Sequence, residues 1–73
     1  MIMSGTREAV LNEVQAVSIH GTIFYDLVYT HAGETRPRRA RVGAESIYAE
    51  PRPGDEVLVA YLMNVATGVS RRS

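Results

Sequence analysis

The stretch that most constrains the fold lies between Pro51 and Met63 and reads PRPGDEVLVAYLM. Its first part is turn chemistry, because proline presets φ, glycine permits positive φ and aspartate can bond the backbone ahead of it. From Val57 onward the residues are mostly β-branched, aromatic or aliphatic, which favours a strand. Both faces of this strand are apolar. We therefore expect it to be central in a sheet, with its second face covered by a helix or by another chain.

Size and composition predict a single small domain that benefits from a partner. The chain has 73 residues and no cysteine, so neither a disulfide nor a thiolate metal site can reinforce a core of this size. Oligomerisation or docking onto a larger body is the remaining way to add stability. The formal net charge is zero, which argues against a dedicated nucleic-acid binder. All eight basic residues are arginine, a side chain suited to bidentate pairing with carboxylate or phosphate.

The N-terminal segment, about residues 5–15, is predicted to be a short helix. Val10, Val14 and Val17 follow one another at i, i+4 and i+7, and Leu11 and Val14 stand at i and i+3. Thr6 is a suitable N-cap residue. A helix of this length is not stable alone in water, so we expect it to dock on the chain's own barrel or on a neighbouring subunit.

Residues 16–72 are predicted to form a small barrel of four to five strands, of OB or SH3-like type, so the fold class is mostly β. Apolar and polar residues alternate from Ala16 onward, and Gly21 within this run indicates a bulge or sharp bend. Residues 31–34 read as a hairpin turn. Thr35–Val42 contains Pro37, which cannot donate to a ladder, and is therefore expected to be an edge strand.

Residues typical of catalytic or metal sites do not form a convincing pattern, and we expect a protein that is not an enzyme and has no cofactor. His20 and His31 are not at a metal-ligand spacing and have no acidic cluster beside them. Ser18, His20 and Asp26 contain the residue types of a catalytic triad but lack a strained nucleophile turn. The absence of lysine also excludes a Walker phosphate-binding loop.

Four arginines within residues 36–41 are the strongest chemical signal, and three interpretations remain open. The strand that carries them can be a solvated edge, protected by charge against aggregation. It can contact phosphate, with nearby aromatic rings for stacking. It can also pair head to tail with the acidic turn of a neighbouring subunit, which contains Asp55 and Glu56, and so build a ring.

Three short motifs carry a resemblance to known families over about residues 17–72. Gly21–Ile23 reads GTI, Pro53–Val59 reads PGDEVLV and Thr67–Val69 reads TGV. This pattern resembles the small OB-type barrels of phage tail and baseplate proteins, such as baseplate assembly protein V. It is also similar to bacterial translation initiation factor one, although that family is rich in lysine and has no N-terminal helix. The first resemblance implies a structural role in a virion, and the second implies RNA binding.

The leading hypothesis is a non-enzymatic assembly module that joins a larger complex, for example a phage virion, with itself or another protein as partner. Its candidate interface residues are Val10, Leu11, Val14, Asp55, Glu56, Leu58 and Leu62. The rival hypothesis is an OB-type binder of RNA or single-stranded DNA. Its candidate residues are Tyr25, Tyr29, Arg36, Arg38, Arg39, Arg41, Arg71 and Arg72. No run reaches transmembrane length and residues 1–9 lack the apolar core of a signal peptide, so we expect an intracellular protein or a virion component.

Overall fold

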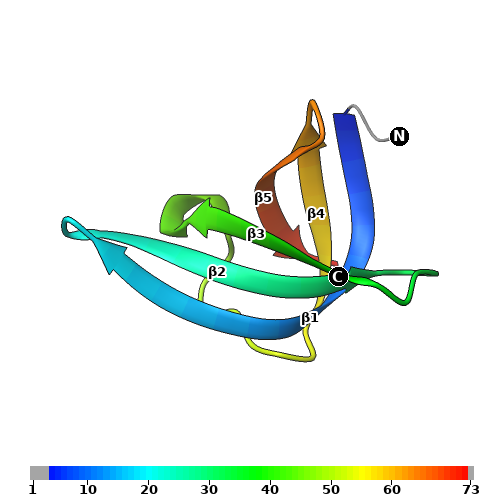
Figure 1. Ribbon diagram of the computed structural model, residues 1–73, viewed down its shortest axis with the longest axis horizontal. Helices are drawn as coiled ribbons and strands as arrows, with labels where there is room; N and C mark the ends of the chain where they lie inside the picture. Colours follow the sequence, from blue (N-terminus) through cyan, green and yellow to red (C-terminus); the bar gives the residue numbers. More distant parts are fainter. Residues whose placement is uncertain (1–3, 73) are drawn as a thin grey trace.

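The computed structural model describes residues 4–72, which form one bent, five-stranded antiparallel sheet (Figure 1). The strands follow the spatial order β3-β2-β1-β4-β5. Their bounds are β1 Ser4–Ile19, β2 Thr22–His31, β3 Pro37–Gly43, β4 Glu56–Leu62 and β5 Val65–Arg71, with one 3₁₀ helix, η1, at Ala44–Ser46. The prediction of a mostly β fold is confirmed.

Strand β1 is the element around which the sheet bends. Its first part pairs with β4, its second part pairs with β2, and Ala9 and Val10 pair with both neighbours. A β-bulge between Leu11 and Glu13 shifts the register with β2 at this point. Because a bulge increases local twist and bends the strand, β1 can leave one half of the sheet and enter the other. The curve of β1 is plain in Figure 1.

The predicted N-terminal helix over residues 5–15 is wrong, because this segment lies in β1. Ala9 and Leu11 face the core with the spacing of two that a strand gives. The bulge then inserts one residue, so the next side chain packed against the core is Val14, three positions after Leu11. The i, i+3 spacing that resembled a helix is therefore a strand interrupted by a bulge. No α-helix occurs within residues 4–72, and hence none there that could cross a membrane.

Two hairpins close with two-residue turns in which both residues have positive φ. His20 and Gly21 join β1 to β2 with φ of 50° and 81°. Met63 and Asn64 join β4 to β5 with φ of 52° and 68°. Turns of this kind match the right-handed twist of the strands that they connect. Gly21, where a bulge or sharp bend was predicted, thus belongs to a hairpin turn, and the bulge of β1 lies near Leu11.

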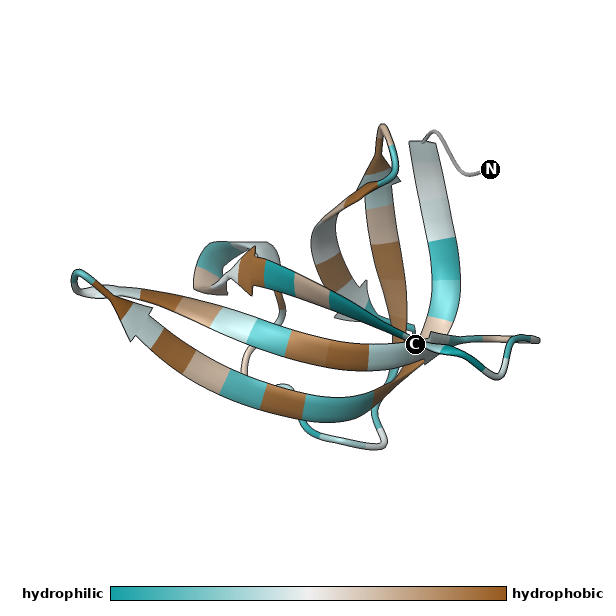
Figure 2. Ribbon diagram, viewed as in Figure 1, coloured by the Kyte–Doolittle hydropathy of each residue, from teal (hydrophilic) through white to brown (hydrophobic). Residues whose placement is uncertain are grey.

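Strand β4 confirms the prediction made from the PGDEVLV motif. It lies between β1 and β5, and Val57, Val59 and Tyr61 are buried on its inner face. On its other face Leu58 and Ala60 are only half-buried, because no helix covers them. Figure 2 shows the apolar character of β4 continuing into the hairpin tip. The buried hydrophobic residues are Ala9, Leu11, Leu27, Tyr29, Val42, Ile47, Val57, Val59, Tyr61 and Val69.

Strand β3 lies at one edge of the sheet, as predicted from Pro37, and β5 lies at the other. The sheet is not closed, since β3 pairs only with β2 and β5 pairs along its length only with β4 within residues 4–72. The segment after β3 nevertheless bends toward β5. Ile47 forms a parallel bridge with Val69, and the backbone oxygen of Ser46 lies beside Gly68.

Candidate interaction surface

The predicted interface residues do not form one surface. Leu62 and Val10 are exposed, whereas Val14 and Leu58 are half-buried. Leu11 is 1% exposed and belongs to the core, so it is not accessible to a partner. The helix face that was to gather Val10, Leu11 and Val14 does not exist, because residues 4–19 form a strand.

The acidic turn is largely occupied by contacts within the chain. The Asp55 carboxylate accepts hydrogen bonds from the Tyr48 hydroxyl at 2.6 Å and from the backbone N–H of Arg52 at 3.0 Å. These two donors hold the pKa of Asp55 below its usual range. Glu56 lies 3.2 Å from Arg72 in an ion pair. Asp55 therefore stabilises its own loop, and only Glu56 remains exposed enough to exchange partners.

Two members of the arginine strand pair with carboxylates of neighbouring elements. Two of the three Arg41 guanidinium nitrogens, Nε and Nη2, donate to Asp26 on β2, at 2.6 and 2.9 Å. Arg38 donates to Glu34 in the preceding turn, at 3.3 and 3.4 Å. These hydrogen bonds lower the pKa of Asp26 and of Glu34. No acidic residue lies within the arginine cluster in the sequence, but in the structure two of its four arginines are paired with carboxylates.

The other candidates for nucleic-acid contact are dispersed. Arg36 and Arg39 are exposed and have no carboxylate partner among residues 4–72. Arg71 lies over the ring of Tyr48, with its guanidinium carbon 4.7 Å from the ring centre, and Arg72 pairs with Glu8 and Glu56. Of the two tyrosines, Tyr25 is half-buried and Tyr29 is buried in the core, so Tyr29 cannot stack with a base.

A buried hydrogen-bonded chain of three side chains was not predicted. The Tyr61 hydroxyl lies 2.7 Å from Nε2 of His31 and 2.8 Å from the hydroxyl of Tyr29. Nδ1 of His31 lies 3.5 Å from Oε1 of Glu34, but it is buried and makes no hydrogen bond within the described residues. This orientation favours the tautomer with the proton on Nδ1, toward the carboxylate, so that Nε2 accepts from Tyr61. The sequence does hold a signal for His31, because it follows Leu27 and Tyr29 on the inner face at intervals of two.

The surroundings of His31 and Tyr29 disfavour the charged form of each side chain. Burial is the main cause that lowers the pKa of His31, and the charges of Arg38 and Arg7 act in the same direction, while Glu34 opposes them. Burial and the hydrogen bond to Tyr61 raise the pKa of Tyr29. His31, Tyr29 and Tyr61 thus form a polar network within the core.

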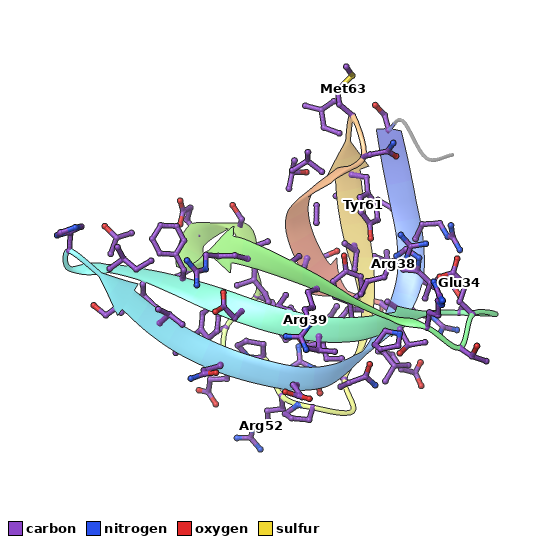
Figure 3. The ribbon with its side chains drawn as sticks, viewed as in Figure 1. Glu34, Arg38, Arg39, Arg52, Tyr61 and Met63 are labelled. Atoms are coloured by element: carbon purple, nitrogen blue, oxygen red, sulfur yellow. The ribbon has the colours of Figure 1, made fainter. Side chains whose placement is uncertain are left out.

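The turn between β4 and β5 exposes large apolar side chains, which we call the apolar tip: Leu62, Met63 and Val65. They are 57%, 67% and 61% exposed. Figure 3 shows Met63 at the end of the hairpin, far from Arg52 in the loop before β4. Met63 also has a φ of 52°. Asparagine and glycine adopt this backbone conformation more readily than methionine does.

The edges of β3 and β5 enclose a groove of about 340 Å³, which we call the β3–β5 groove. It is lined by residues 38–41 of β3 and by residues 64–66 of the other hairpin, with Tyr29 and Tyr61 at its base. Within residues 4–72 no three histidine, cysteine or acidic side chains converge as metal ligands. Comparison with models of protein families, with curated proteins and with solved structures found no match to this chain.

Proposed function

We propose that this protein is a non-enzymatic assembly module, a small OB-like barrel that joins a larger protein complex through its apolar tip. A phage virion is one such complex. The observation that carries the proposal is Met63, which is 67% exposed at a positive φ. A turn selected only for stability would place asparagine, aspartate or glycine there. An apolar residue that is unfavourable both for solvation and for backbone conformation indicates a binding role.

The OB-like assignment rests on topology. In the order β3-β2-β1-β4-β5 with antiparallel neighbours, the two edge strands run in the same direction. The parallel bridge between Ile47 and Val69 brings the two edges of the bent sheet toward each other. A long first strand shared by both halves, followed by a parallel approach of the third and fifth strands, supports the proposal of a partly open, OB-like five-stranded barrel.

Binding of single-stranded nucleic acid is the second candidate function, and it is favoured by Arg36 and Arg39. Both guanidinium groups are exposed on or beside β3 without a carboxylate partner in the described part of the chain. The assembly module is preferred because Arg38 and Arg41 are paired with acids and the net charge is zero. The second candidate predicts that a fluorescent oligonucleotide binds at low salt and is released steeply as salt rises.

The mass of the protein in solution and in its source tests the assembly proposal. Sedimentation velocity and light scattering, from micromolar to millimolar concentration, should detect association with itself or, in source extracts, with a larger particle. The double variant Leu62→Thr/Met63→Asn should reduce this association at least tenfold. Ile23→Thr is the matched control, since it also removes an exposed apolar side chain, 42% exposed, from β2 beside the other hairpin turn. A monomer under all conditions and in the source would disprove the proposal.

A further inference from the structure

The two free edges of the sheet are the starting point. Along β3 every second residue directs its N–H and C=O away from β2, because hydrogen-bonded and non-hydrogen-bonded pairs alternate in an antiparallel ladder. No strand of the described chain pairs with that side of β3. Unpaired edges of this kind are templates for another strand, and proteins that keep one open use it for recognition or protect it.

The β3–β5 groove places the open edge beside a second wall. Residues 38–41 belong to the edge of β3, and on the opposite side the groove is lined by the turn residue Asn64 and by Val65 and Ala66 at the start of β5. The two edges approach each other farther along, where the bridge between Ile47 and Val69 forms. The groove is therefore the unpaired end of the seam between β3 and β5. Its volume suits a short extended segment rather than a folded domain.

The charge of the groove selects the chemistry of its occupant. Arg38, Arg39 and Arg41 line it, and residues 38–41 and 64–66 together contain no acid. Arg38 donates hydrogen bonds to Glu34, and Arg41 donates to Asp26. Arg39 has no carboxylate partner within residues 4–72. Figure 3 shows Arg38 close to Glu34 and Arg39 separate from both. An acidic side chain of a partner can pair with Arg39 without displacing an existing contact.

We propose that the β3–β5 groove is a docking site for an extended acidic peptide segment of a partner protein, which adds to the edge of β3 as an antiparallel strand. This inference rests on the proposed function, because it assigns the chemistry of one partner of the assembly module. Main-chain hydrogen bonds to β3 supply the affinity. Alternate acidic side chains meet Arg39 and Arg41, which share one face of β3, and the intervening side chains lie on the opposite face, where Arg38 and Ala66 line the groove.

A peptide fits the groove better than a nucleic acid does. The open edge offers backbone donors and acceptors at the repeat of a strand, which a peptide backbone matches and a sugar–phosphate backbone does not. Stacking requires exposed aromatic faces, and the tyrosines at the base of the groove are 2% and 9% exposed.

A selection from a random twelve-residue peptide library against the intact protein tests the inference, followed by NMR titration of the enriched peptides. Enriched sequences should be acidic and free of internal proline. They should shift the amide signals of residues 38–41 and 64–66 and slow amide hydrogen exchange along β3. Arg39→Glu should weaken binding at least tenfold. Arg52→Glu is the matched control, because it makes the same charge change on the far loop and should alter binding less than twofold. The amide spectra of both variants confirm that they are folded.

Three results would overturn the inference: no peptide with a Kd below about 1 mM, peptides that shift only residues outside the groove, or equal loss in Arg39→Glu and Arg52→Glu. A twelve-residue oligothymidine that binds the groove when peptides do not would also overturn it, in favour of nucleic acid. The test is separable from that of the proposed function. If no peptide binds but the protein still assembles through its apolar tip, only the proposal for the groove fails. If peptides bind but the protein is strictly monomeric, the proposed assembly role fails.

Discussion

Replacing Tyr61 by phenylalanine removes the single hydroxyl that joins His31 and Tyr29. The substitution retains the ring and changes little volume, so its effect isolates two hydrogen bonds, of 2.7 and 2.8 Å. All three side chains are at most 9% exposed, and water cannot easily replace the lost partner. Each such bond contributes about 1 kcal/mol, and a buried polar group left without a partner costs about 1–3 kcal/mol. We expect a loss of about 2–4 kcal/mol in the free energy of unfolding.

This loss is large for a chain of this size. A domain of 73 residues is stable by about 4–11 kcal/mol. For domains of about this length 1 kcal/mol shifts the melting temperature by about 4–8 °C, so the variant should melt at least about 8 °C below the parent. Urea titration and thermal melting followed by circular dichroism measure both quantities. No tryptophan is present to report unfolding by fluorescence.

Tyr25→Phe is the matched control. Tyr25 is a half-buried tyrosine of the same strand as Tyr29, and its hydroxyl makes no hydrogen bond to another side chain within residues 4–72. We expect its loss to stay within about 0.5 kcal/mol. If Tyr61→Phe costs no more than Tyr25→Phe, the hydrogen-bonded chain does not stabilise the fold and the reasoning fails.

Three further predictions follow from the same geometry. The pKa of His31 is lower in the folded chain than its ordinary 6.5, so the unfolded chain binds more protons as pH falls below about 7, and stability measured by urea titration should decrease from pH 7 to pH 5. His31→Gln should flatten this dependence of stability on pH, whereas His20→Gln, at the exposed turn, should leave the dependence unchanged. An unchanged dependence in His31→Gln would contradict the assignment of the effect to His31. The pKa of Asp26, measured by NMR of its carboxyl carbon, should lie below 3.8 and should rise in Arg41→Gln, because the hydrogen bonds from Arg41 favour the ionised form. Met63→Asn should raise the free energy of unfolding by about 0.5–1 kcal/mol, since asparagine tolerates the positive φ; a destabilised variant would show that Met63 packs within the fold.

Local chemistry explains which parts of the fold the sequence predicts. The turn at Pro53–Asp55 and the strand after it are specified by neighbouring residues, and both are found where expected. Pro37 likewise predicts the edge position of β3, because a missing N–H excludes a central ladder. The bulge near Leu11 is different. It depends on the backbone of the loop before β4, since the N–H of Leu11 donates to Asp55 and the N–H of Gly54 donates to Leu11. These two contacts join residues 44 and 43 positions apart in the chain and leave no local signal, so the strand was predicted as a helix.

The same distinction applies to the candidate site. Exposure of the arginines on an edge strand follows from their spacing, but their neutralisation by Asp26 and Glu34 depends on the register between β2 and β3 and on the turn geometry. The buried chain at His31 depends on β4 approaching β2 from the far side of β1, because Tyr61 is thirty residues away. The alternation of side chains along β2 could have predicted that His31 lies on the inner face, but it could not have predicted that Tyr61 is its partner.

A comparison of the two hairpin turns supports the proposed binding role of the apolar tip. Both have two residues at positive φ, and thus the same backbone requirement. The turn after β1 meets it with His20 and Gly21, the residue types that tolerate such angles and water. The turn after β4 has the same geometry, yet it places Met63 at the first position, between exposed Leu62 and Asn64. The backbone geometry does not require methionine at this position, since the first turn adopts the same geometry without an apolar residue. Selection for stability does not require it either, because Met63 contacts solvent over two thirds of its surface. The difference between the two turns is what the proposed assembly role predicts, in which a partner protein covers Leu62, Met63 and Val65.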